Sequence, residues 1–304
     1  MNPIIALSEL RFRWRAQGPE TLRIDALEVA AGERLFVEGP SGSGKSTLLG
    51  LLAGVNQPQQ GRIQVLGERL DQLSPTARDR FRADHIGYLF QLFNLIPYLG
   101  ILDNVTLPAR FSRHRRARAL ARSPSLVAEA KRLLTHLDLD LDLDQRALAR
   151  QAVSELSIGQ QQRVAAARAL FGSPALLIAD EPTSSLDADR RRAFLELLFA
   201  ECAETGSTLI FVSHDASLEG LFDRTLRLPE LNQATDRGGP AARLRAAPVA
   251  QAQAAQAPAD QAPAAQTPAA QAPAAQAPAA QAPAPRASAA LTATQPLDRQ
   301  PPAP

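Results

Sequence analysis

Short apolar runs alternate with longer amphipathic stretches along the first 232 residues of the chain. Two stretches, residues 48–52 and 188–202, have the spacing of helices with one buried face. Four apolar runs have the length of buried strands and are bounded by glycine, polar or charged residues: 35–37, 86–90, 176–179 and 209–212. Alternation of this kind predicts an α/β fold with a largely parallel sheet covered by helices.

The stretch from residue 92 to residue 156 breaks this alternation. It has helical patterns and no run that fits a buried strand. We therefore expect a helical subdomain at about residues 92–160, inserted into the α/β core. Near the N-terminus, Leu10, Phe12 and Trp14 alternate with polar residues and would share one face of a strand.

The composition changes near residue 235. After residue 236 the chain has no aromatic residue, and 13 of its 24 prolines lie in this part, among alanine and glutamine. From Gln256 to Pro283 both glutamine and proline recur every five residues, which prevents a continuous helix and favours extended chain. We expect residues 233–304 to be a disordered tail that buries too little apolar surface to fold, with a recognition tail as the alternative.

The overall composition, with 45% hydrophobic and 21% charged residues, is that of an ordinary soluble protein. No apolar run approaches the roughly 18 residues that a membrane-spanning helix requires. No basic region precedes an apolar stretch at the N-terminus, so we expect a cytoplasmic protein. The single cysteine, Cys202, excludes an internal disulfide and a cysteine-based zinc cluster.

The charge of the chain does not predict a nucleic-acid partner. Five arginines and three aspartates lie from Gln233 onward, which leaves 28 basic and 28 acidic side chains in the first 232 residues. Binding to a phosphate backbone requires basic residues clustered on one face. We interpret one basic cluster as a solvated helix face, with contact to anionic lipid or a membrane protein as the alternative. Its members are Arg113, Arg115, Arg116, Arg118 and Arg122.

A glycine-rich loop follows the apolar run 35–37 and precedes the helical stretch 48–52. It matches the pattern Gly-x4-Gly-Lys-Ser/Thr, in the strand-before and helix-after context that this pattern requires. Glycines let backbone N–H groups turn inward around a polyphosphate, and the helix start adds partial positive charge. We expect Lys45 to reach the β- and γ-phosphates and Ser46 to ligate Mg²⁺. The loop consists of Gly39, Pro40, Ser41, Gly42, Ser43, Gly44, Lys45, Ser46 and Thr47.

Two observations strengthen the assignment of a phosphate site. The chain has 31 arginines and only two lysines, and one of the two is Lys45, where a compact ammonium fits and a planar guanidinium does not. The apolar run 176–179 ends in Asp180 and Glu181, at the sheet edge where the phosphate loop is expected. There Asp180 would hold Mg²⁺ through water, and Glu181 would orient or deprotonate the attacking water. Together the two motifs predict a nucleoside triphosphatase.

Between these motifs, residues 156–170 read Leu-Ser-Ile-Gly-Gln followed by Gln-Gln-Arg-Val-Ala-Ala-Ala-Arg-Ala-Leu. This stretch resembles the signature sequence and following helix of the ATP-binding cassette (ABC) ATPases, the nucleotide-binding subunits of ABC transporters. The resemblance implies that Ser157, Gly159 and Gln160 bind the γ-phosphate of ATP held by a partner subunit. Taken alone, Ser157 would be a helix N-cap. Ile158 stands where the family usually has glycine, and its β-branched side chain requires a helical or extended backbone.

Three further residues follow the order of the family's elements. Gln91 resembles the glutamine that contacts Mg²⁺ or water and relays to the membrane partner; alone it would be one exposed glutamine. Asp187 ends the segment 184–187, which resembles the loop that crosses the dimer interface; alone it would be a helix cap. His214 resembles the histidine that contacts the γ-phosphate; alone it would be structural.

The family stacks an aromatic side chain on adenine at about the distance before the phosphate loop at which Trp14 lies. The resemblance therefore assigns Trp14 to adenine, with Phe12 as a second candidate and core packing as the alternative role of Trp14. Within the family, residues 90–97 and 103–105 look most like the subunits that drive lipoprotein release and macrolide export.

The resemblance covers about residues 4–232 and implies a P-loop α/β core with an N-terminal antiparallel β portion and a helical subdomain. It implies a homodimer with ATP and Mg²⁺ between the two chains. The dimer would power a separate transmembrane permease, for export or extrusion, from the inner face of the cell membrane. The alternative is a non-transport ABC ATPase that acts on a cell-division or other membrane complex. Chromosome and repair ATPases place a long coiled coil between their phosphate motifs, whereas Lys45 and Asp180 are only about 135 positions apart.

Overall fold

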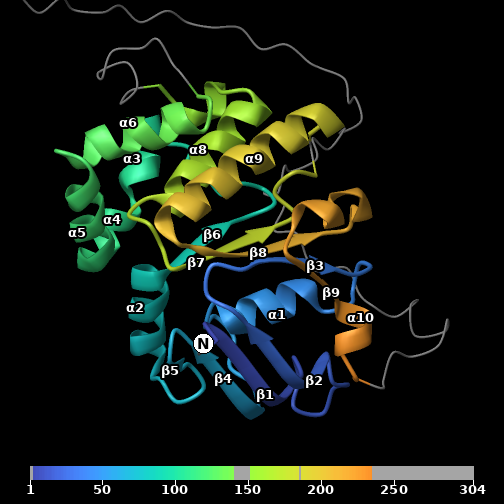
Figure 1. The fold of residues 1–304 in the computed structure, drawn as a ribbon. Helices are drawn as coiled ribbons and strands as arrows, with labels where there is room; N and C mark the ends of the chain where they lie inside the picture. The colour runs from blue at the N-terminus through green and yellow to red at the C-terminus, as the bar shows by residue number, and fades with distance from the viewer. Residues whose placement is uncertain (1–2, 140–150, 185, 235–304) are drawn as a thin grey trace, which may run out of the picture. The chain divides into compact units, whose positions relative to one another are not determined.

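The computed structural model describes residues 3–139, 151–184 and 186–234. These residues form one antiparallel and one parallel β-sheet with helices packed around them (Figure 1). Of the predicted tail, only residues 233 and 234 are described, so the expected disorder of the tail lies outside this part of the chain. No helix in the described ranges has both the length and the apolar character needed to cross a bilayer.

The antiparallel sheet confirms the predicted N-terminal β portion. Glu9 has a left-handed backbone with φ of 51°, and the register of β1 against β4 shifts between Ser8 and Arg11. This bulge moves the alternation by one position, so Leu10 and Phe12 are buried on the face that the first half of the strand uses. In spatial order the strands are β2 (Leu22–Val29), β1 (Ile5–Phe12), β4 (Gln60–Val65) and β5 (Glu68–Arg69).

The parallel sheet contains the four strands that the sequence predicts, each matched within one residue at either end. The sequence did not predict the fifth strand, β9, because it is short, polar and at the sheet edge. In spatial order the strands are β6 (Ile86–Leu89), β7 (Leu176–Asp180), β8 (Thr208–Ser213), β3 (Arg34–Glu38) and β9 (Arg224–Arg227). Every pairing is parallel, so the carboxyl ends of the strands meet at one edge.

This parallel sheet separates two hydrophobic cores. Successive strand residues point to opposite faces, so Phe36 and Phe211 belong to one core and Val37 and Val212 to the other. The second core fills the space between the parallel sheet, the antiparallel sheet and three helices. These are α1 (Lys45–Leu52), α2 (Pro75–His85) and α10 (Leu228–Leu231).

The first core lies on the helical side of the sheet. In the described part of residues 92–160 the only β pairing is the isolated bridge between Gly100 and Ala152, in agreement with the predicted helical insertion. The predicted helix 188–202 runs three residues further, until Gly206 ends it in a left-handed conformation. The elements of this side are α3 (Ile101–Thr106), α4 (Pro108–Phe111), α5 (Arg113–Arg122), α6 (Leu126–His136), η1 (Val153–Glu155), α8 (Ile158–Leu170) and α9 (Ala188–Thr205), and the 3-10 helix η2 (Ala216–Leu221) contributes Leu218 to the same core.

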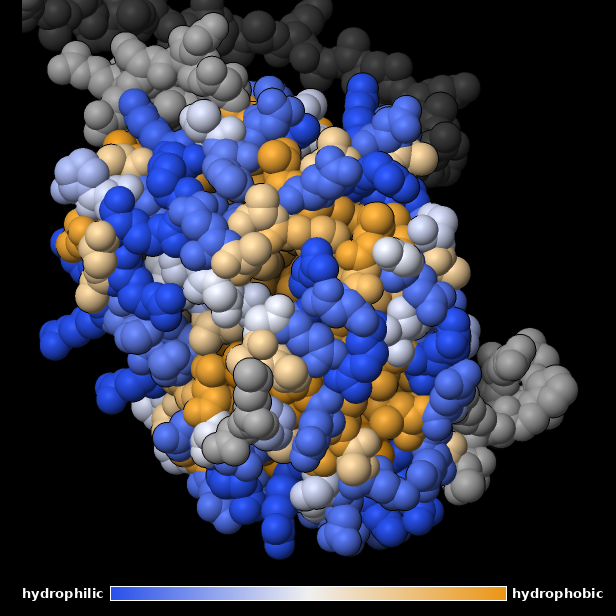
Figure 2. Space-filling model, in the orientation of Figure 1, coloured by the Kyte–Doolittle hydropathy of each residue, from blue (hydrophilic) through white to orange (hydrophobic). Residues whose placement is uncertain are grey.

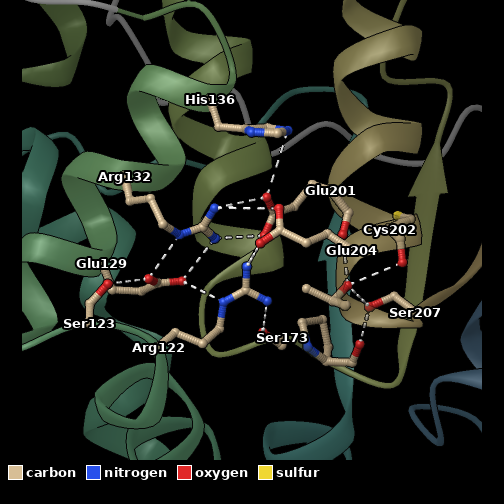
Figure 3. Close-up of polar contacts among 12 residues, drawn as sticks. Arg122, Ser123, Glu129, Arg132, His136, Ser173, Glu201, Cys202, Glu204 and Ser207 are labelled. Atoms are coloured by element: carbon tan, nitrogen blue, oxygen red, sulfur yellow. Dashed lines mark hydrogen bonds and ion pairs between the residues drawn. The ribbon is translucent and has the colours of Figure 1, made fainter.

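A cluster of ion pairs joins α5, α6 and α9 (Figure 3). Glu201 of α9 is buried, and its carboxylate accepts hydrogen bonds of 2.7 and 3.2 Å from Arg132 of α6. Arg122 of α5 lies 2.5 Å from Glu204. Ligating atoms of His136, Glu201 and Glu204 lie close enough to share a metal ion, but both carboxylates are already bound by the guanidinium groups of Arg122 and Arg132. The cluster is therefore a structural tie between three helices.

Arg115 shows that the basic cluster is not one solvated face. Its side chain is buried, and its guanidinium donates to the carbonyl oxygens of Phe171 at 2.7 Å, Ala169 at 2.5 Å and Ile86 at 3.4 Å. Two of these carbonyls end α8, where a positive charge is favoured. Burial lowers the pKa of Arg115 to about 9, which leaves the guanidinium charged at neutral pH. Of the cluster, Arg113, Arg116 and Arg118 are exposed or partly exposed, and the partly exposed Arg122 belongs to the ion-pair cluster.

On the face seen in Figure 2, hydrophilic residues cover most of the rim, and hydrophobic residues show through between the helical layer and the strands below it. Exposed large apolar side chains lie mainly in loops and near helix ends: Trp14, Val55, Phe90, Leu92, Tyr98, Phe111, Leu120 and Ile158. Three of them, Phe90, Leu92 and Tyr98, lie within eight positions of Gln91. The segment 90–98 therefore presents apolar surface beside a candidate site residue.

Candidate nucleotide-binding site

The loop between β3 and α1 has the backbone of a phosphate cradle. Gly42 and Gly44 have φ angles of 78° and 103°, which side chains with a Cβ rarely adopt. A Cβ on Gly39 would lie 2.7 Å from the Ser43 hydroxyl oxygen, and one on Gly44 would lie 2.7 Å from Leu22 Cδ2. The positive φ angles therefore favour glycine at positions 42 and 44, and a side chain at position 39 would require Ser43 to move. The helix after the loop begins at Lys45, three residues earlier than the sequence predicted.

Lys45 is folded back onto this loop. Its ammonium donates to the carbonyl oxygens of Gly39 at 2.6 Å and Pro40 at 3.3 Å, and it lies 3.7 Å from Glu181 Oε1. The side chain is buried. Phosphate oxygens can therefore replace these neutral carbonyl oxygens as the hydrogen-bond partners of the ammonium group.

Glu181 directly follows β7, and its side chain contacts two other candidate residues, Lys45 and His214. It has a left-handed backbone with φ of 46°, and its N–H donates to the Val212 carbonyl at 2.9 Å. In this conformation its Oε2 lies 3.1 Å from His214 Nδ1, while Oε1 faces Lys45. Strained residues of this kind are concentrated at functional sites. Lys45, Glu181 and His214 thus meet at the carboxyl edge of the parallel sheet.

A cavity of about 390 Å³ opens beside this cluster. His214 lines it together with residues of the loop and of the segment after β8. The lining consists of Glu38, Gly39, Pro40, His214, Arg227, Pro229 and Glu230. Of the cluster, His214 therefore borders open space that a ligand can enter.

Asp180 and Ser46 provide the oxygen atoms predicted to hold Mg²⁺. Burial and the neighbouring Glu181 raise the pKa of Asp180, whereas the Ser46 hydroxyl and Lys45 lower it. A partly buried carboxylate beside a second carboxylate is an arrangement that a divalent cation stabilises. Because hydroxyl and carboxylate oxygens are the hard ligands that Mg²⁺ prefers, the residues present fit this ion.

Gln91 lies at the rim of the same edge. Leu89 of β6 is paired with Ala179 of β7, so the segments that follow the two strands leave the sheet side by side. Gln91 is exposed, and its amide makes no hydrogen bond to another described residue. The loop that carries Gln91 therefore leaves the sheet beside the segment of Asp180 and Glu181.

The signature residues lie at the start of α8 and form a helix cap. The Ser157 hydroxyl accepts from the Gln160 N–H at 3.3 Å, and Gln160 Oε1 accepts from the Ser157 N–H at 2.9 Å, which is a capping box. Ile158 is the first helical residue, in agreement with the expected backbone, and it is exposed. Because α8 packs in the first core and α1 in the second, the two helices lie on opposite sides of the parallel sheet.

Asp187 caps the next helix on this side. Its carboxylate accepts from the Arg190 N–H at 2.9 Å at the start of α9. Asp187 is therefore the N-cap of α9 in the single chain, and its contact across a dimer interface stays a prediction. Of the segment 184–187, residue 185 lies outside the described ranges.

Trp14 lies beyond the end of β1, and the core role considered for it is wrong. Its side chain is 64% exposed, and one edge meets Phe12 at a ring distance of 5.1 Å. Phe12 is buried, which leaves Trp14 as the aromatic group with free surface. The backbone N–H of Thr21 donates to Phe12, and Thr21 is also next to Gly44, so Trp14 lies on the strand end that reaches the phosphate loop.

Asn232 is a site residue that sequence reasoning missed. Its Nδ2 donates to the carbonyl oxygens of Thr21 at 2.9 Å and Ser43 at 3.3 Å, and its Oδ1 accepts from the Arg23 N–H at 2.9 Å. The side chain is buried. It therefore holds the phosphate loop against β2 from the C-terminal end of α10. Its only signal in the sequence was its place directly before the change in composition.

Comparisons with known proteins agree with this geometry. The family model described as "ABC transporter" matches residues 22–184. The chain is 44% identical over 202 residues to the uncharacterized ABC transporter ATP-binding protein YbbA of Escherichia coli K12, covering 66% of this chain and 83% of that protein. It is 35% identical over 232 residues to the lipoprotein-releasing system ATP-binding protein LolD of Chromohalobacter salexigens, covering 75% and 92%. The dimeric post-hydrolysis structure of the ATP-binding cassette MJ0796 with ADP and Pi has a TM-score of 0.60 and 30% identity, covering 74% and 94%.

Proposed function

The chain belongs to the ABC transporter family, and from this premise we propose that it is the ATP-hydrolysing subunit of a transporter whose membrane-spanning part is a separate permease. The observation that carries the proposal is the cluster of Lys45, Glu181 and His214 beside the loop 39–44. It combines a cation for the γ-phosphate, a carboxylate for the attacking water and an imidazole that contacts the carboxylate.

Catalysis in this site is positioning and charge neutralisation. The N–H groups of the loop 39–44 bind the phosphates, and Lys45 exchanges its carbonyl partners for β- and γ-oxygens. Glu181 accepts a hydrogen bond from the attacking water and orients it, and His214 holds Glu181 through Nδ1 and contacts the γ-phosphate. Ser46 and Asp180, with Gln91 at the rim, would hold Mg²⁺, which when bound neutralises charge on the β- and γ-oxygens.

A second copy of the chain completes each site in this proposal. Ser157, Gly159 and Gln160 start a helix on the opposite side of the sheet from α1, so their N–H groups would serve the ATP of the partner. Asp187 would lie at the interface, and Trp14 would stack on adenine. The dimeric state of the MJ0796 cassette supports this arrangement.

The permease is proposed as a separate chain that meets the apolar segment 90–98. Phe90, Leu92 and Tyr98 are exposed there, next to Gln91. The similarity to LolD, a lipoprotein-releasing subunit, supports export or extrusion as the direction. The subunit would then lie at the inner face of the membrane, bound through its partner.

Release of phosphate from ATP by the purified chain, with and without Mg²⁺, tests the proposal. We expect turnover that requires Mg²⁺ and is lost in Lys45→Met. Because the chain has only one other lysine, Lys131 on α6, Lys131→Met is a matched control that should keep the wild-type rate. A wild-type chain that binds no nucleotide, or an active Lys45→Met variant, would overturn the assignment.

A tagged chain isolated from detergent-solubilised membranes tests the partner. We expect a polytopic membrane protein to co-purify, and its yield should fall in Leu92→Asp or Tyr98→Asp variants that keep wild-type phosphate release. Co-purification with a cell-division complex instead would favour the non-transport function.

A further inference from the structure

The signature helix α8 holds the loop that carries Gln91. Arg168, near the C-terminal end of α8, donates from one guanidinium nitrogen to the Phe93 carbonyl at 2.5 Å and from the other to the Asn94 carbonyl at 2.7 Å. These carbonyls lie two and three positions after Gln91. The planar guanidinium has two parallel donors, so it can fix two consecutive peptide groups where a lysine could fix one.

The backbone that Arg168 holds is strained. Phe93 and Asn94 have φ angles of 60° and 49°, and neither residue is glycine. The Phe93 side chain is buried in the first core, while the carbonyl groups of both residues face α8. Consecutive left-handed residues persist only where surrounding contacts hold them. Here the contacts are the core on one side and Arg168 on the other.

The charge of Arg168, like that of Arg115, has no carboxylate partner among the described residues. Arg122 and Arg132, on the same side of the sheet, both pair with acidic groups. Burial lowers the pKa of Arg168, which reflects the cost of removing the cation from water. Arg115 binds carbonyls at the end of α8 and in β6, whereas Arg168 binds carbonyls of the loop that carries Gln91, which links Arg168 to the candidate site.

A second side chain of α8 reaches the other catalytic segment. Gln162 is buried, and its Nε2 donates to the Pro182 carbonyl at 2.9 Å, directly after Glu181. The helix therefore contacts the backbone behind both Gln91 and Glu181. Its first residues are those assigned above to the ATP of the partner chain.

We propose that Arg168 is a positioning residue for Gln91, which fixes the loop 90–94 to α8 so that the Gln91 amide is held at the catalytic edge. The proposal rests on the function assigned above. It also implies that a shift of α8, when its first residues engage the partner's ATP, moves Gln91 with it. Arg168 itself touches neither nucleotide nor water.

Steady-state hydrolysis of Mg-ATP by Arg168→Met and Arg168→Lys tests the proposal. We expect kcat of Arg168→Met to fall about 10- to 100-fold, the loss typical of a misplaced catalytic group, with KM for ATP changed less than about twofold. Arg168→Lys, which keeps one donor, should lie between this variant and the wild type. Arg224→Met is the matched control, since Arg224 also donates to a backbone carbonyl, that of Glu28 at 2.7 Å, and lies at the amino end of β9, away from the carboxyl edge of the sheet where the phosphate loop begins.

A double-mutant cycle separates positioning from a general loss of structure. In a Gln91→Ala background, Arg168→Met should lower kcat by less than about twofold, because the group that it positions is gone. An equal loss in both backgrounds would overturn the proposal. So would a wild-type kcat in Arg168→Met.

Amide hydrogen exchange gives a readout that does not depend on activity. Exchange across residues 91–95 should be faster in Arg168→Met than in the wild type and unchanged in Arg224→Met. Unchanged exchange in Arg168→Met would contradict the proposal even if kcat falls. If the wild-type chain hydrolyses no ATP, the proposed function fails, whereas the exchange result still decides whether Arg168 holds the loop.

Discussion

The two sides of the parallel sheet hold their loops by different means. On the side of α1, the phosphate loop is shaped mainly by glycines and by contacts within the loop, as for Lys45 with Gly39, and the amide of Asn232 is an additional distant contact. On the side of α8, loops are held by long side chains that reach distant carbonyl groups, as for Arg115 with Phe171 and Arg168 with Asn94. The first side is built to surround a ligand, and the second to keep helices and catalytic loops in register.

Two unique residues let each side be observed separately. The only tryptophan, Trp14, is exposed at the strand end that reaches the phosphate loop. The only cysteine, Cys202, is buried in the core of the helical side, and burial raises the pKa of its thiol to about 12. Trp14 emission therefore reports on the nucleotide side, and the rate of Cys202 labelling reports on opening of the helical side.

The largest effect is expected from Arg115→Met. The substitution leaves three carbonyl groups without their donor in a buried site, which should lower the free energy of unfolding by about 3 kcal/mol. Urea unfolding measures the loss, and Cys202 should become labelled faster in native conditions. Arg116→Met, on the exposed face of the same helix, should change stability by less than about 0.5 kcal/mol. If both substitutions lower the free energy of unfolding equally, the buried Arg115 does not stabilise the fold more than the exposed Arg116.

On the nucleotide side, Gly44→Ala should weaken ATP binding more than Gly42→Ala. Both residues have positive φ, but a Cβ on Gly44 would meet Leu22 at 2.7 Å, whereas one on Gly42 has nothing within 4 Å. We expect about 2 kcal/mol of lost binding free energy for Gly44→Ala and about 1 kcal/mol for Gly42→Ala, measured by calorimetry. Cys202 labelling should stay slow in both variants. The reverse order of affinities would show that the loop changes conformation when ATP binds.

A smaller effect is expected from Trp14→Ala. Stacking on adenine should change Trp14 emission when ATP is added to the wild type, and its removal should weaken ATP affinity by about 1 kcal/mol. Val55→Ala, at another exposed apolar residue, is the control and should leave affinity unchanged. Unchanged emission together with unchanged affinity in Trp14→Ala would place the adenine elsewhere.

The smallest effect is expected from removal of residues 240–304. A segment without aromatic residues and with proline every five positions offers little apolar surface to pack on the ATPase. The melting temperature and the ATPase rate of the truncated chain should equal those of the full chain within error. A marked loss of activity would indicate that the tail regulates the folded part.

The sequence predicted those features whose determinants are local. Lys45, Asp180 and Glu181 stand in short motifs, and each strand of the parallel sheet but β9 is marked by its own apolar run. Arg168 and Asn232 act on carbonyl groups 74 and 189 positions away, and a carbonyl carries no side-chain identity by which a pattern could reveal it. The expectation that Trp14 shares a strand face with Leu10 and Phe12 is wrong because β1 ends at Phe12, whereas its assignment to adenine stays a prediction.

The measurement that tests the central claim most directly is the mass of Glu181→Gln in solution with Mg-ATP. The variant keeps the phosphate loop and loses the carboxylate that orients water, so it should bind ATP, release phosphate at less than about 1% of the wild-type rate, and form a stable dimer by light scattering. The dimer should not form when Lys45→Met is added. A Glu181→Gln variant that hydrolyses ATP at the wild-type rate, or that binds ATP and remains a monomer, would contradict the account.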